Sequence, residues 1–85
     1  MITLYIKRII MTIDLSNIFI FKTNIQTEFD KLRIKNVLDA SQKVLKWNID
    51  LDDADHVLRI VSDSLRPEQI ISVIDYVGFE CSELE

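Results

Sequence analysis

The sequence contains one cysteine, one histidine, one glycine and one proline. A single cysteine cannot form an internal disulfide, which excludes a small secreted scaffold held together by disulfides. One cysteine with one histidine also falls short of the ligand set of a structural zinc site. The P-loop and the dinucleotide-binding fingerprint are excluded because each requires several glycines.

A large excess of charge of one sign is also absent. The chain carries 10 Lys and Arg residues against 14 Asp and Glu residues, a formal net charge of -4. A mildly acidic chain with dispersed charges binds phosphate backbones poorly, so we expect no nucleic-acid partner. With 48% apolar and 28% charged residues in 85 positions, the composition is typical of one small soluble globular domain.

The most apolar stretch covers residues 2–21 and contains Lys7, Arg8 and Asp14. These charges leave no uninterrupted run of the length that a membrane-spanning helix needs. Asp14 also interrupts the apolar region that a signal peptide would require. The sequence therefore predicts a cytoplasmic protein with no membrane partner.

Residues 1–16 differ from the rest of the chain and are interpreted as an N-terminal extension of a domain that covers residues 17–85. They are rich in Ile and Leu and contain a second methionine, Met11. One interpretation, which we favour, is an upstream extension with the natural start at Met11. The other is an additional element that covers an apolar face of the domain.

From Asn17 onward, hydrophobic periodicity predicts alternating strands and helices. The expected order is a strand at 18–21, a helix from 27 to about 42, strands at 44–51 and 56–61, a helix from 67 to 77, and a strand at 79–84. Thr27 and Asp30 have the spacing of a capping box, in which the acid would accept from the Thr27 amide. Pro67 suits a first helical turn, and Gly78 suits the left-handed position after a helix end.

This order of elements contains two strand–helix–strand halves. Each half favours a right-handed crossover. The expected fold class is therefore α/β (α+β), a ferredoxin-like two-layer sandwich with a four-stranded antiparallel sheet and two helices on one face.

Three segments between Asn17 and Leu84 resemble the heavy-metal-associated (HMA) domain of copper chaperones and metal-pumping ATPases. The segment 44–51 (VLKWNIDL) is similar to the second strand of that family, and the segment 65–71 (LRPEQII) is similar to the opening of its second helix. The pair Gly78-Phe79 matches the glycine and aromatic residue that end that helix. Together, their order and spacing imply an HMA-like, copper-chaperone-like fold.

The metal motif of that family is missing. The family binds soft metals through Met-x-Cys-x-x-Cys between the first strand and first helix, because thiolates select such ions. An ungapped alignment places Ile25, Thr27 and Asp30 at the Met and the two Cys positions. A shift by one residue would place Gln26 and Phe29 at the two Cys positions. Neither register supplies a thiol, so we expect no metal and no cofactor at this loop.

The remaining candidate ligands are Cys81 and His56. Cys81 is expected to be a small strand residue, and the ferredoxin-like topology would bring it near the loop of the degenerate metal motif. His56 is expected to be a solvated residue at the start of the third strand. The acidic cluster of Asp50, Asp52, Asp53 and Asp55 lacks the Gly and the terminal Glu of a calcium loop and is interpreted as a solvated hairpin. Capping explains Thr27, Glu28 and Asp30 without a hard cation, since a helix N-terminus favours acids.

Apolar residues of the first strand predict a protein contact. Helices cover one face of the sheet, so either Phe19 and Phe21 or Ile18 and Ile20 should face outward. We expect a protein partner or a homodimer at this open sheet face, unless residues 1–16 cover it. Trp47 is expected to belong to the core rather than to a binding surface.

No catalytic constellation is found, and the chain is predicted not to be an enzyme. The leading hypothesis is a small non-enzymatic interaction or regulatory module with an HMA-like fold and no cysteine metal site. The alternative is a copper- or zinc-binding or transport-related protein that uses weak or non-thiolate ligands. A small enzyme is a third hypothesis.

Overall fold

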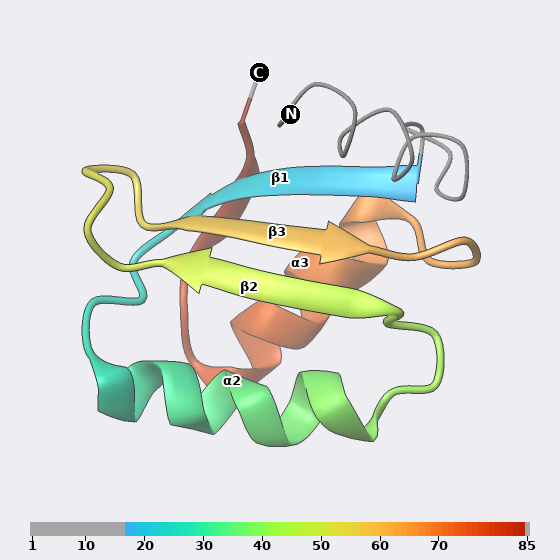
Figure 1. Cartoon of the computed structure of the whole chain (residues 1–85), viewed down its shortest axis with the longest axis horizontal. Helices are drawn as coiled ribbons and strands as arrows, with labels where there is room; N and C mark the ends of the chain where they lie inside the picture. Colours follow the sequence, from blue (N-terminus) through green and yellow to red (C-terminus); the bar gives the residue numbers. More distant parts are fainter. Residues whose placement is uncertain (1–16, 85) are drawn as a thin grey trace, which may run out of the picture.

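The computed structural model describes residues 17–84, and the expected extension at residues 1–16 lies outside this part. Figure 1 shows the elements in chain order. They are β1 (Ile18–Thr23), α2 (Glu28–Ala40), β2 (Lys46–Asp50), β3 (Val57–Val61), α3 (Pro67–Val77) and β4 (Cys81–Glu83). The strand and helix order predicted from the sequence is confirmed, with strands that are shorter than expected at β2, β3 and β4.

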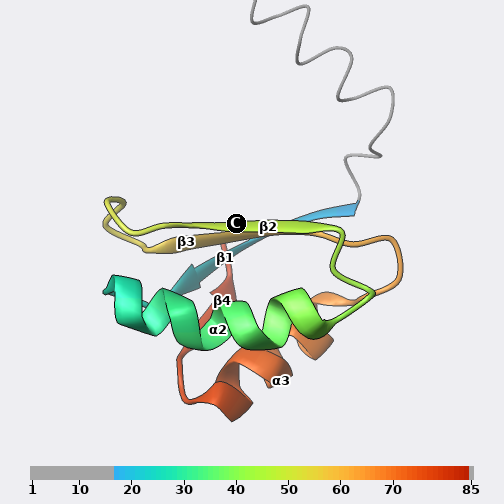
Figure 2. The same cartoon turned by 60° about the horizontal axis from the view of Figure 1, so that its bottom comes forward.

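The four strands form one antiparallel sheet in the order β2-β3-β1-β4. In β1, Phe19 lies opposite Ile60 of β3, and Thr23 lies opposite Cys81 of β4. Figure 2 shows both helices below the same face of the sheet. The ferredoxin-like two-layer architecture is therefore confirmed.

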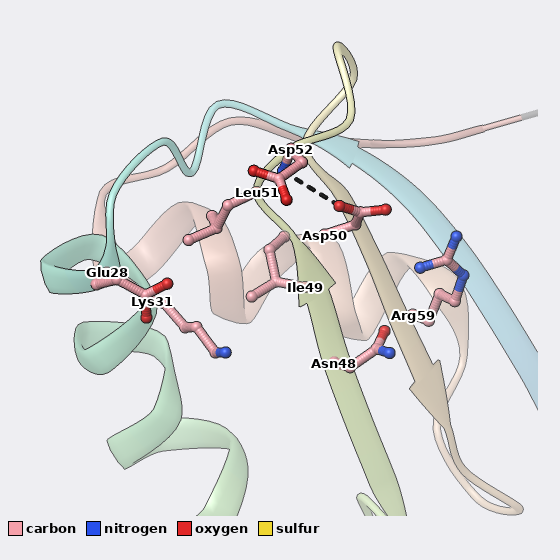
Figure 3. A pocket seen from close by; sticks show the side chains of 8 residues that line it. All are labelled: Glu28, Lys31, Asn48, Ile49, Asp50, Leu51, Asp52 and Arg59. Carbon is pink, nitrogen blue, oxygen red and sulfur yellow. Dashed lines mark hydrogen bonds between the residues drawn. The ribbon is translucent and has the colours of Figure 1, made fainter.

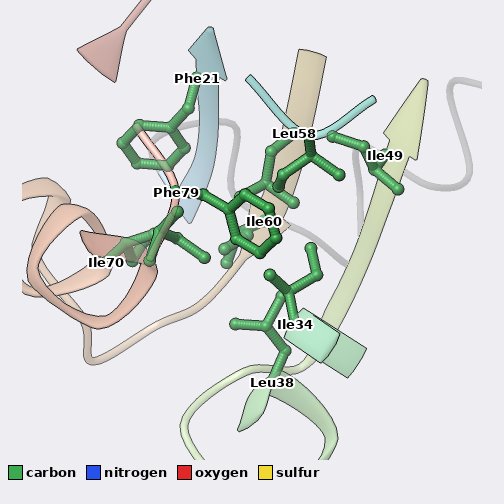
Figure 4. Close-up of a cluster of buried hydrophobic side chains, with 10 residues drawn as sticks. Phe21, Ile34, Leu38, Ile49, Leu58, Ile60, Ile70 and Phe79 are labelled. Atoms are coloured by element: carbon green, nitrogen blue, oxygen red, sulfur yellow. The ribbon is translucent and has the colours of Figure 1, made fainter. Parts of the chain in front are cut away.

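The core fills the space between the sheet and the helices (Figure 4). Alternate residues of β1 and β3 point toward the helices because side chains of a strand alternate between its faces. The fully buried members are Phe21, Ile25, Ile34, Leu58, Ile60 and Ile74. Ile34 is contributed by α2 and Ile74 by α3, which lie within the two helices predicted from the sequence.

The ends of α3 have the expected geometry. Pro67 opens the helix, and the side-chain Oε1 of Gln69 accepts a hydrogen bond from the Arg66 amide at 2.8 Å. Gly78 adopts the left-handed conformation with φ 110°, which an L side chain rarely adopts. The turn at Gly78 places Phe79 back in the core, where it is 7% exposed.

Arg33 on α2 joins the two helices. Its guanidinium donates from Nη2 to the carbonyl oxygen of Val77, the last residue of α3, at 2.7 Å. The guanidinium carbon also lies 4.9 Å from the centre of the Phe79 ring, in cation–π geometry. This contact holds the middle of α2 against the end of α3.

Candidate functional site

The candidate site is the loop of residues 24–27, which leads from β1 into α2. Ile25 is fully buried in the core, and its amide donates to Thr23 Oγ1 at 3.2 Å. The Thr23 hydroxyl in turn donates to the carbonyl oxygen of His56 at 2.6 Å. Ile25 therefore anchors the loop in the core, in agreement with the apolar position assigned to it.

Thr27 is the N-cap of α2. Its backbone is extended, with φ −127° and ψ 163°, and its Oγ1 accepts a hydrogen bond from the Asp30 amide at 3.0 Å. This bond satisfies one of the amides that have no partner within the helix. The Thr27 half of the predicted capping box is therefore confirmed.

The prediction for the other half of the capping box is wrong in one respect, the amide that Asp30 accepts from. Asp30 Oδ2 accepts from the amide of Gln26 at 3.2 Å, whereas the amide of Thr27 was expected to be the donor. With the extended backbone at Thr27, the Gln26 amide rather than the Thr27 amide lies within reach of the Asp30 carboxylate. The two residues at the thiol positions of the family motif, Thr27 and Asp30, thus both accept hydrogen bonds from main-chain amides.

Cys81 begins β4 and lies opposite Thr23, beside the loop. The side chain is half-buried and packs against the core, and burial raises the pKa of its thiol to about 12. The thiolate, which is the form that binds metals and attacks electrophiles, is therefore a minor species at neutral pH. The environment of Cys81 favours a packing role.

His56 differs from its expected state. It lies just before β3 and has a positive φ of 45°, so it is a turn residue rather than the first residue of the strand. The residue is half-buried, and its Nδ1 is buried without a hydrogen-bond partner, so the expectation of a solvated side chain is wrong. The positive φ of His56 departs from the extended backbone of a strand, so strand alternation does not predict the environment of this side chain.

The acidic hairpin between β2 and β3 uses its carboxylates for local turns. Asp50 Oδ1 accepts from the Asp52 amide at 3.1 Å, and Asp53 Oδ1 accepts from the Asp55 amide at 2.8 Å. Asp55 also lies 3.7 Å from the ammonium group of Lys22. Within residues 17–84, no group of three or more His, Cys, Asp or Glu side chains could hold a metal ion.

Trp47 packs against the core from β2, and its indole N–H donates to Asp39 Oδ1 on α2 at 2.7 Å. Lys35 bonds to the other oxygen of the same carboxylate at 2.6 Å. Hydrogen bonds from Lys35 and then from Trp47 lower the pKa of Asp39. The polar atom of the indole thus has a partner, which is consistent with a structural role.

A polar hollow lies between the start of α2 and β2 (Figure 3). Its lining residues are Glu28, Lys31, Asn48, Ile49, Asp50, Leu51, Asp52 and Arg59. Figure 3 shows acidic and basic side chains spread around the rim, with one drawn hydrogen bond, between Asp52 and Asp50. This arrangement does not form a nucleophile, base and oxyanion site of the kind that catalysis requires.

The open face of the sheet carries residues that the sequence pattern identified only in part. Phe19 and Phe21 point toward the helices, so Ile18 and Ile20 lie on the open face, where Ile20 is 40% exposed. Strand register places Val61 beside Ile18, and the Leu84 amide donates to the Ile20 carbonyl at 3.0 Å. Ile18, Ile20 and Leu84 line a shallow hollow. Val61 and Leu84 were not identified from the sequence because cross-strand neighbours depend on register.

The charge of this face also depends on register. Four charged strand residues alternate with core-facing positions and therefore point away from the helices. They are Lys22, Lys46, Arg59 and Asp50. The open face therefore combines an apolar centre with an excess of cations, although the whole chain has a net charge of -4.

Comparison with solved structures gives the fold an independent test. The solution structure of the yeast copper-transporter domain Ccc2a, determined in the apo and Cu(I)-loaded states, superposes with a TM-score of 0.68 and 21% identity. The match covers 80% of this chain and 94% of the Ccc2a chain. The chain has the fold of a copper-transporter domain. The solution structure of the Atx1-Cu(I)-Ccc2a complex matches with a TM-score of 0.70 and 21% identity, again over 80% of this chain and 94% of that one.

No family model and no curated protein matches the sequence. The likeness to Ccc2a confirms the HMA-like, copper-chaperone-like fold expected from the three sequence segments. The whole chain has one cysteine, so it lacks the pair of thiols of the family motif. Among the described residues, no helix is long and apolar enough to cross a membrane.

Proposed function

We propose that this chain is a non-enzymatic, cytoplasmic protein-interaction module that retains the HMA-like fold without thiolate metal binding. The observation that carries this proposal is the cap at the start of α2. Thr27 Oγ1 holds the Asp30 amide at 3.0 Å, at the positions where the family motif has its two thiols. A helix cap and a soft-metal site require different atoms at the same place, and this loop has the atoms of the cap.

The chemistry of the neighbouring residues supports the loss of metal binding. Cys81 is the one thiol of the chain, and its pKa is raised to about 12 by burial. It therefore offers neither the second sulfur nor the thiolate state that Cu(I) coordination favours. The proposed location in the cytoplasm is based on the charged residues within the apolar stretch 2–21, which interrupt both a membrane-spanning run and the apolar region of a signal peptide.

The open face supports the role in protein contacts. Ile18, Ile20 and Leu84 form an apolar centre beside the cation Arg59, which is exposed. An apolar patch with basic neighbours is complementary to a protein surface that has apolar side chains and acidic neighbours. The neighbour Ccc2a forms a complex with Atx1, so a domain of this fold takes part in protein assembly.

A competition titration with a Cu(I) chelator tests the loss of metal binding. We expect the chelator to remove all Cu(I) from the natural chain, and we expect Thr27→Cys with Asp30→Cys to retain it. Stoichiometric retention by the natural chain would contradict the proposal and would favour the alternative of unusual ligands, with Cys81→Ser and His56→Gln identifying them.

The contact surface is tested with the double variant Ile18→Lys, Ile20→Lys. A matched control is Leu32→Lys, because Leu32 is 51% exposed on α2 in the helical layer. With a purified partner, we expect binding to be lost in the double variant and kept in the control. Equal binding by both variants would remove the open face from the proposal.

A further inference from the structure

The outer edge of β2 is a free strand edge. In the sheet order β2-β3-β1-β4, β2 has β3 on one side and no strand of residues 17–84 on the other (Figure 1). A free edge presents main-chain N–H and C=O groups that can pair with another strand.

The hydrogen-bond pattern identifies which main-chain groups face outward. The Ser62 amide donates to the carbonyl oxygen of Asn17, which lies just before β1. The carbonyl oxygen of the preceding residue, Val61, instead accepts from the Leu45 amide, which lies just before β2. Successive residues of an antiparallel strand form main-chain hydrogen bonds on alternate sides, so Val61, Arg59 and Val57 of β3 all bond toward β2. The residues of β2 that lie opposite these three therefore use their main-chain groups to bond to β3. The main-chain groups of Trp47 and Ile49 therefore face the free edge.

The sequence of β2 is complementary to itself when two copies run antiparallel about Asn48. Lys46 then lies opposite Asp50 of the second copy, and this pair occurs twice by symmetry. Trp47 lies opposite Ile49 of the second copy, which aligns the outward main-chain groups of one strand with those of the other. A parallel arrangement would instead place like charges of the two strands beside each other, which is unfavourable.

The side chains of β2 are compatible with this pairing. Lys46 and Asn48 are exposed, and Asp50 uses one carboxylate oxygen, Oδ1, for the Asp52 amide. The indole of Trp47 is directed toward α2 by its bond to Asp39 and so does not bond across the outer edge. The Asp50 and Asn48 side chains stand beside the polar hollow, as Figure 3 shows.

We propose that two copies of this chain associate through antiparallel pairing of their β2 strands about Asn48. The dimer would have two-fold symmetry, with the same residues contributed by each copy. Its sheet would be continuous through eight strands, since each copy supplies the four strands of one sheet. The proposal does not depend on the proposed function, which uses the open face of the sheet rather than its edge.

Charge reversal provides a direct test. The variants are Lys46→Glu, Asp50→Lys, and the two together, all in the full chain, with Lys43→Glu as the control. Lys43 is exposed in the connection before β2, and its reversal changes the net charge as Lys46→Glu does. Circular dichroism first confirms that each variant is folded.

Sedimentation equilibrium at low salt, up to about 1 mM chain, measures association. We expect each single reversal to weaken dimerisation roughly tenfold or more, because two attractive charge pairs become repulsive at once. The combined variant should recover the affinity of the natural chain. An equimolar mixture of the two single variants should form a heterodimer, since all its charge pairs are attractive again.

Amide hydrogen exchange supplies a second measurement. We expect exchange at Trp47 and Ile49 to slow as the concentration of the natural chain rises. A monomer throughout this range, or a dimer that responds to Lys43→Glu as strongly as to Lys46→Glu, would overturn the proposal. A dimer abolished by Ile18→Lys, Ile20→Lys and unaffected by both single reversals would place the contact on the open face and would also overturn it.

Discussion

The cap of α2 leads to a quantitative prediction for Thr27→Ala. The substitution removes the Oγ1 atom that accepts from the Asp30 amide at 3.0 Å. Loss of a Thr cap destabilises proteins by about 0.5–2 kcal/mol, with about 1 kcal/mol typical. Here the amide is at an exposed site, so water replaces part of the lost bond, and we expect a value near 1 kcal/mol.

For a domain of this size, a loss of about 1 kcal/mol lowers the melting temperature by roughly 4–8 °C. Urea unfolding followed by circular dichroism measures the free energy, and calorimetry measures the midpoint. Thr27→Ser is the matched control because it keeps the accepting oxygen. We expect it to change the free energy of unfolding by no more than a few tenths of a kcal/mol.

A local readout separates the cap from a general packing effect. The Asp30 amide should exchange its hydrogen faster in Thr27→Ala, while amides in β1 and β3 keep their relative protection. If Thr27→Ala and Thr27→Ser had the same stability, the cap would contribute nothing measurable. The structural explanation for the missing thiols would then fail as well.

Three further predictions concern other parts of the chain. Cys81 should react slowly with a thiol reagent at pH 8 in the folded protein and rapidly in urea, because burial raises the pKa of its thiol to about 12; equal rates would contradict this environment. At His56, with φ 45°, His56→Val should lower the free energy of unfolding by about 1–2 kcal/mol. His56→Asn should be tolerated, since Asn occupies this conformation more readily, and the reverse order in urea unfolding would argue against the left-handed turn. Deletion of residues 1–10, which lie outside the described part, should leave unfolding cooperative near the original midpoint; a large shift in calorimetry would show that they contribute to the stability of the domain.

Local sequence patterns predicted the fold well where the controlling interaction is itself local. The alternation around Trp47 predicted the face of β2 that lies against the helices, and Pro67 and Gly78 predicted the ends of α3. Each of these signals depends on backbone geometry within a few residues.

Features that depend on contacts between strands were not predictable in the same way. The hydrogen bond from the Thr23 hydroxyl to the His56 carbonyl joins residues 33 positions apart. Val61 and Leu84 belong to the open face only because of the register of β3 and β4 against β1. Buried Ser62 accepts from two amides of the following loop, at Ser64 and Leu65, which composition alone does not indicate.

The bond from Arg33 to the end of α3 has a consequence for how the domain unfolds. The last turn of α3 has no basic residue of its own, so the positive charge near its terminal carbonyls comes from α2. Separation of either helix would expose the Phe79 ring and leave the carbonyl of Val77 without this donor. The helical layer should therefore open as one cooperative unit, with amides of both helices exchanging at a common rate under mildly denaturing conditions.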